Sequence, residues 1–223
     1  PNADFVLSHL LCQLANYGLA TLILIERGLD ASARGSLRMT LELSGIILCL
    51  MASREEFKEY VAQKDEIAAK RLWDRLFRPK HINERLSKLE QALVLDEDLV
   101  GDLSRSRTRA YAFYSQAVHH SYISVSLGTR AFHYDGTRLG FGLFGGPNAA
   151  SSSTFGYLNY TFWHFLLMFF AILDRVHHFH PRHPEKDFWM QAFVLREFVT
   201  RVFLSLEHND NAERADNQGR LIF

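Results

Sequence analysis

Hydrophobic residues recur at three- and four-residue spacing along most of the chain, the period of amphipathic helices. The pattern predicts helices at about 4–27, 31–52, 54–77, 83–94, 103–127, 153–178 and 185–207. Gly28 and Pro79 are predicted to end the first and third helices, and Asp30 to cap the second. Ser53-Arg-Glu-Glu56 fits a capping box that opens the third helix.

The period changes between Arg130 and Gly142, where aromatic residues flank Asp135-Gly136. Asp-Gly between such runs predicts a tight β-hairpin. We therefore expect residues 1–223 to form a single all-α domain, a bundle of about seven helices with a small β-hairpin insertion near 130–142. A polar tail is expected from about residue 209.

The composition excludes several classes of protein. The chain is 48% hydrophobic, and 25 Lys and Arg balance 25 Asp and Glu, so no global charge indicates nucleic acid or an anionic membrane. Cys12 and Cys49 lie in apolar runs, which predicts two small buried hydrophobic residues rather than a disulfide. Polar residues interrupt the apolar stretches 5–25 and 156–173, so we expect buried bundle helices in a cytoplasmic protein without membrane contact.

A polar seam is predicted between the second helix and the helix at about 103–127. On the latter, one arc of about 80° holds Tyr111, Ser115, His119, Tyr122 and Ser126. Buried hydroxyls and imidazoles need partners, and the second helix offers a stripe of Arg34, Arg38 and Glu42. We therefore expect a cluster of Arg38, Glu42, Tyr111, Ser115 and His119, with Tyr122 beside it.

The seam has two interpretations. A contact between Glu42 and His119 would raise the pKa of His119 and orient its ring for general acid/base chemistry. The alternative is a satisfied polar network that fixes the register of the two helices.

These residues also carry a resemblance. Arg38, Glu42, Tyr111 or Tyr114, Ser115 and His119, followed by a hairpin, resemble a bacterial all-helical family of unknown function across about 31–175. Such proteins are distantly similar to HEPN-type bundles, many of which are dimers that act as RNases in toxin or defence systems, while others are inert. The resemblance implies a possible homodimer and a possible RNA substrate.

The HEPN nuclease signature is an Arg followed by a His after four to six residues. Three pairs match, namely Arg75…His81, Arg175…His180 and Arg201…His208, which is about the number that chance predicts. On the RNase hypothesis, His119 or His208 acts as the acid/base, and Arg38 or Arg201 holds the phosphate.

Three further segments carry residues with possible chemistry. His177–His183 contains four histidines, but no Glu-x-x-His or Cys-x-x-Cys partner accompanies them, so we expect a surface tract without metal. Arg105-Ser-Arg-Thr-Arg109 places arginines about 200° apart on a helix, which favours local salt bridges with the preceding acidic turn over a phosphate site. The aromatic stretch Tyr157–Phe170 is expected to supply core and also a dimer contact.

No hydrolase, metalloprotease or dinucleotide-binding motif is present in the sequence, and no cofactor is expected. The sequence therefore favours a non-catalytic module that binds a partner chain or a small ligand. The alternative is a HEPN-like RNase.

Overall fold

The computed structural model describes residues 3–93, 97–118, 132–134, 139–141, 147 and 149–179, with isolated positions between 187 and 197. The helices are α1 (Ala3–Glu26), α2 (Asp30–Ala52), α3 (Arg54–Val61), α4 (Glu66–Leu72), the π-helix η1 (Trp73–Phe77), α5 (Pro79–Leu93), α6 (Glu97–Val118) and α8 (Ala149–Arg175). A short antiparallel pair, β1 (Phe132–Tyr134) and β2 (Leu139–Phe141), aligns His133 with Gly140. The described part of the chain is therefore an all-α protein of about eight helices, with this short pair inside the range where the sequence predicts a hairpin.

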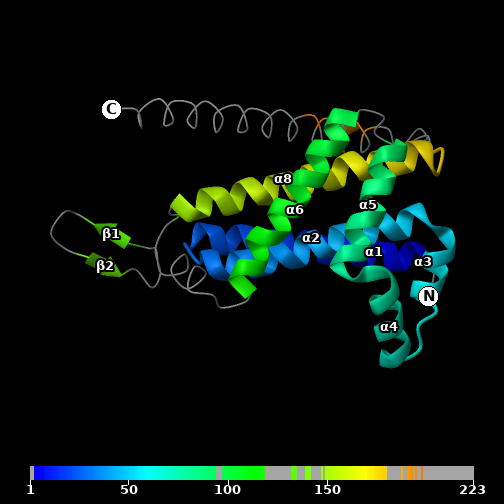
Figure 1. Cartoon of the computed structure of the whole chain (residues 1–223), viewed down its shortest axis with the longest axis horizontal. Helices are drawn as coiled ribbons and strands as arrows, with labels where there is room; N and C mark the ends of the chain where they lie inside the picture. The colour runs from blue at the N-terminus through cyan, green and yellow to red at the C-terminus, as the bar shows by residue number, and fades with distance from the viewer. Residues whose placement is uncertain are drawn as a thin grey trace.

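Helix α2 lies at the centre of the bundle and packs against α1, α5, α6 and α8 (Figure 1). Its C-terminal half is buried on every side, from Ser44 to Met51. A helix that is apolar all round has to be enclosed by others, which explains its central place. The main core joins Ile47 and Leu48 of α2 to Met168 and Ile172 of α8.

Two of the predicted helix boundaries are confirmed and one is wrong. The Ser53 side chain accepts the backbone N–H of Glu56 at 3.4 Å, and Gly28 ends the first helix with a left-handed φ of 68°. Asp30, however, is the first residue of α2, and Leu29 holds the N-cap position without a side-chain bond. The Asp30 carboxylate instead pairs with Arg34, one turn further on, at 2.7 Å.

The predicted helix at 54–77 is divided into three elements. Asp65 starts a new helix because its side chain accepts the backbone N–H of Ala68 at 2.7 Å. Pro79 was predicted only to end the preceding helix, but it is also the first residue of α5. Proline is tolerated there because the backbone N–H that it lacks would have no partner in the first turn of a helix. Helix α6 begins at Glu97, earlier than expected, because acidic side chains favour the first turn of a helix.

The aromatic stretch on α8 lies largely in the core, where Trp163, Phe165 and Phe170 are buried. Cys49 is buried as expected, but Cys12 is exposed, so that prediction is wrong: α1 buries Leu10 and Leu14 on the opposite face. The predicted last helix and the polar tail lie largely outside the described residues.

Three helical segments are long and apolar enough to cross a membrane, namely Asp4–Glu26, Asp30–Ala52 and Ser151–Arg175. The second of these contains the Asp30–Arg34 pair and is mostly buried within the bundle. The cytoplasmic location therefore stays a prediction.

Candidate functional site

The predicted seam between α2 and α6 brings three of its five residues together. Arg38 donates from Nε to Glu42 Oε1 at 2.9 Å and from Nη2 to the Tyr111 hydroxyl at 3.0 Å. The bond to Glu42 raises the pKa of Arg38. Ser115 is half-buried one turn further along α6, and His119 and Tyr122 lie outside the described residues. The contact between Glu42 and His119 therefore stays a prediction.

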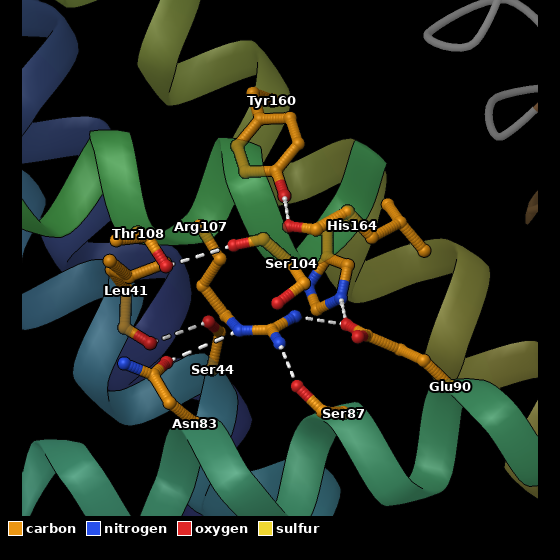
Figure 2. Close-up of polar contacts among 11 residues, drawn as sticks. Leu41, Ser44, Asn83, Ser87, Glu90, Ser104, Arg107, Thr108, Tyr160 and His164 are labelled. Atoms are coloured by element: carbon orange, nitrogen blue, oxygen red, sulfur yellow. Dashed lines mark hydrogen bonds and ion pairs between the residues drawn. The ribbon is translucent and has the colours of Figure 1, made fainter. Parts of the chain in front are cut away.

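A second polar cluster, which the sequence analysis did not predict, lies next to this seam (Figure 2). It joins Arg107 of α6, Glu90 of α5 and His164 of α8, and each of these residues is at most 2% exposed. Arg107 Nη1 forms an ion pair with Glu90 Oε1, and His164 Nε2 lies 2.7 Å from the same oxygen. One carboxylate thus links three helices in a nearly fully buried site.

Helix α5 supplies most of the partners of Arg107. Asn83, Ser87 and Glu90 are spaced by four and three residues, so they share one face of the helix. Arg107 Nε donates to Asn83 Oδ1 at 3.2 Å, and Nη2 donates to Ser87 Oγ at 2.9 Å. All three guanidinium nitrogens therefore bond to α5, whereas Glu90 Oε2 is buried with no hydrogen-bond partner.

A small pocket connects the two clusters between α2, α5, α6 and α8. Its volume of about 20 Å³ holds one water-sized group. Its partly exposed rim is formed by Glu42, Pro79, Asn83 and Tyr111. Its buried floor is formed by Leu41, Ser44, Ile82, Leu86, Arg107 and His164.

Arg107, which lines the pocket, and Arg38, which lies beside it, are both paired with negative charges. Arg38 pairs with Glu42 at the rim, and Arg107 pairs with Glu90 at the floor. Hydrogen-bonding capacity nevertheless remains. Tyr111 accepts from Arg38 and keeps its own hydroxyl hydrogen, and Asn83 accepts through its oxygen and keeps its amide hydrogens. The lining therefore suits an uncharged polar group better than an ion.

A further buried ion pair fixes the other end of α2. Asp30 and Arg34 are both nearly fully buried, and Thr154 of α8 bonds to both. The Arg34 guanidinium lies 3.8 Å from the centroid of the Phe113 ring on α6. Burial is the largest influence on Arg34 and lowers its pKa, while Asp30 opposes this shift. This pair holds α2, α6 and α8 together and does not line the pocket.

Of the residues in the three predicted nuclease pairs, the structure describes Arg75, His81 and Arg175, so the pairs stay a prediction. Arg75 is exposed and pairs with Glu59, while Arg175 donates to the Leu93 carbonyl. His180, Arg201 and His208 lie outside the described residues.

The other charged segments behave largely as surface features. Arg105 pairs with Asp102, which confirms a local salt bridge, although Arg107 beside it is buried. In the histidine tract, His177 Nε2 lies 2.8 Å from the Met51 carbonyl oxygen. The described residues contain no group of three His, Cys, Asp or Glu side chains that could hold a metal ion.

One sequence signal could have revealed Arg107. It shares its helix face with Leu103, Ala110 and Tyr114, all of which are buried. A charged residue within such an apolar row needs a buried partner of opposite charge. The alternate spacing of Arg105, Arg107 and Arg109 hides this signal, because the two neighbours of Arg107 are exposed.

Comparisons with known protein families, with curated proteins and with solved structures find no match for this chain.

Proposed function

We propose that this chain is a non-catalytic helical module that binds a small, uncharged polar molecule at the pocket between α2, α5, α6 and α8. The observation that carries the proposal is the pairing of charges around the pocket. Arg107 is paired with Glu90 and Arg38 with Glu42, while Tyr111 and Asn83 retain hydrogen-bond donors. A hydroxyl or amide group can use these donors without breaking an ion pair.

The size of the pocket limits how the molecule binds. With room for about one water-sized group, the floor accepts a single polar group, and the rest of the molecule lies at the rim beside Tyr111. Ligands this small gain at most roughly 1.5 kcal/mol per non-hydrogen atom, so affinities in the millimolar range are expected.

The RNase alternative requires a site that binds the phosphate of RNA. A phosphate is best held by an arginine that is free to bond to its oxygens. Arg107 and Arg38 are each engaged by a carboxylate, and freeing Arg107 would leave Glu90 buried without its charge partner. This arrangement supports binding of a neutral molecule over phosphate chemistry.

Thermal unfolding with small probe compounds tests the proposal. Acetamide and glycerol are the neutral probes, and acetate and phosphate are the charged ones. At about ten times its Kd, a bound probe adds about 1.4 kcal/mol to the unfolding free energy. We expect this gain with a neutral probe for the wild type and for Tyr17→Phe, whose hydroxyl bonds to Gln13 on α1. Tyr111→Phe should lose most of it.

A stabilisation by phosphate but not by acetamide or glycerol would contradict the proposal. Total RNA incubated with the wild type, with His119→Ala and with His208→Ala separates the alternative. We expect intact RNA with all three proteins, and cleavage that is lost in one of the two variants would replace the binding module with an RNase.

A further inference from the structure

The pocket between α2, α5, α6 and α8 has hydrogen-bond donors and acceptors on different helices. The donors come from Asn83 of α5 and Tyr111 of α6. Their oxygens already accept from Arg107 and Arg38, so their own N–H and O–H hydrogens remain for a ligand. The acceptors come from α2, and their arrangement limits which neutral molecule fits.

Glu42 brings a carboxylate oxygen to the rim of the pocket. Its Oε1 accepts from Arg38 Nε at 2.9 Å, and within the described part of the chain no group donates to its Oε2. The Glu42 side chain is only 15% exposed, so water screens this oxygen less than that of a carboxylate in open solvent. A hydrogen bond to an ionised oxygen is about twice as strong as one between neutral groups. Glu42 therefore favours a ligand that presents a hydrogen to it.

Ser44 adds a second acceptor, at the floor of the pocket. Its Oγ donates to the Leu41 carbonyl at 2.8 Å, which uses its one hydrogen and leaves its lone pairs. Figure 2 shows that Ser44 and Asn83 lie on the same side of Arg107. Ser44 is 2% exposed, so a ligand oxygen placed against it would lose its hydration without gaining a bond. The α2 wall of the pocket thus accepts hydrogen bonds at both its rim and its floor.

We propose that the pocket selects a primary amide among neutral polar molecules, and that Glu42 is the residue that determines this preference. The inference rests on the proposed function, because it takes the pocket as the binding site of a neutral molecule. The amide oxygen accepts from Asn83 or Tyr111, and an amide N–H donates to Glu42 Oε2. A primary amide carries its lone pairs and its two N–H hydrogens on separate atoms, so it matches donors and acceptors that lie on different helices.

Other small groups match this lining less well. A ketone has the acceptor oxygen but no hydrogen for Glu42. An alcohol has one hydrogen, and its donor and acceptor share a single oxygen atom. A carboxylate meets the like charge of Glu42 and has no hydrogen to donate to it.

The apolar part of the lining limits the rest of the ligand. Leu41, Ile82 and Leu86 are buried at the floor and offer only carbon contacts there. With a volume of about 20 Å³, the pocket has no room for a long chain beside the polar group. The ligand is therefore an amide on a short aliphatic carbon, for which acetamide is the simplest probe.

An NMR titration of the full chain with acetamide, acetone and propan-2-ol tests the preference. The three probes have nearly the same shape and differ in the hydrogens that they donate. We expect the wild type to bind acetamide about five- to tenfold more tightly than either of the others, which is about the contribution of one hydrogen bond to a charged group at a partly exposed site.

Two glutamate variants test the role of Glu42. Glu42→Gln should lose most of the preference for acetamide, and it should bind acetate more tightly than the wild type does, because Arg38 no longer has its charge partner. Glu56→Gln is the matched control. It removes a comparably exposed carboxylate that pairs with Arg85 and does not line the pocket, so it should behave like the wild type.

The possible results separate this inference from the proposed function. Equal affinity of the wild type for acetamide and acetone would overturn the amide preference and leave the proposed function standing, since both probes are neutral. A wild type that binds none of the three neutral probes would overturn both. A Glu42→Gln variant that keeps the wild-type preference for acetamide would overturn the role of Glu42. The probe series on the wild type tests the preference without any substitution, so it does not depend on how well the variants fold.

Discussion

Glu90 meets two buried side chains through one oxygen, since Arg107 Nη1 and His164 Nε2 both contact Oε1. Because a carboxylate accepts hydrogen bonds, His164 presents its Nε2–H to Glu90. The carboxylate therefore orients the ring of His164 and holds Arg107 at the floor of the pocket. The polarity of the pocket depends on this residue although Glu90 does not line it.

The first prediction follows from that dependence. Glu90→Gln removes the charge that compensates Arg107 in a fully buried site, and breaking a buried pair costs about 3–5 kcal/mol. Urea unfolding should show this loss. Glu59→Gln, which breaks the exposed pair with Arg75, should cost less than about 1 kcal/mol. Equal losses of unfolding free energy in the two variants would show that a group other than Glu90 compensates the charge of Arg107.

The second prediction concerns pH. Burial raises the pKa of the Cys49 thiol from 9.0 to about 11. The thiol of the unfolded chain ionises first, so the stability that the protonated thiol contributes is present below pH 9 and is lost as the pH rises towards 11. Two pKa units correspond to about 3 kcal/mol.

The measurement for this prediction is the unfolding free energy of the wild type minus that of Cys49→Ala. This difference should be constant from pH 7 to pH 8 and should fall by about 3 kcal/mol between pH 9 and pH 11. A constant difference over the whole range would mean that the thiol reaches solvent in the folded state.

At the level of the elements, the sequence indicates which segments are helical but not how all of them begin and end. Helical periodicity is a local property, which is why every helix before residue 119 matches a predicted helical segment. Boundaries depend on single side chains whose partners come from the fold. Asp30 fits a cap by type, yet it pairs with Arg34 because α8 closes over that end of α2.

Alanine substitutions at the two glycines of α2 are predicted to have opposite effects on stability. A Cβ on Gly35 would meet nothing within 4 Å, whereas a Cβ on Gly45 would lie 2.7 Å from Ile82 Cγ2. Gly35→Ala should stabilise the protein by about 0.5–1 kcal/mol, because alanine is the better helix former. Gly45→Ala should destabilise it by about 1–3 kcal/mol through overpacking against α5.

Chemical denaturation of both variants checks this pair. If Gly45→Ala were stabilising to the same extent as Gly35→Ala, α5 would not pack against α2 at Ile82. That packing forms one wall of the pocket, so the result would also remove the site.

At the level of the whole molecule, the pocket could not be predicted because its walls come from positions far apart in the sequence. Glu42, Asn83, Arg107 and His164 belong to four different helices. Arg38, Glu42 and Tyr111 were foreseen because two neighbouring helices suffice to bring them together. The contact of Arg107 with Glu90 depends on how α5 crosses α6, which no helical period specifies.

The packing of α5 against α6 also explains why the site remains polar inside an apolar bundle. Arg107 bonds to Asn83 and Ser87 as well as to Glu90, so α5 satisfies all three guanidinium nitrogens. A buried charge is tolerated where its partners are fixed in advance. On the proposed function, the small space beside it is preorganised for one uncharged polar group.

An NMR titration with acetamide and with acetate tests this account most directly. The two compounds have nearly the same shape and differ in charge, and the side-chain amide signal of Asn83 reports from the rim of the pocket. The account predicts a saturable shift of this signal with acetamide at millimolar concentrations and little change with acetate. A saturable shift with acetate and none with acetamide would contradict the claim that the pocket recognises a neutral molecule.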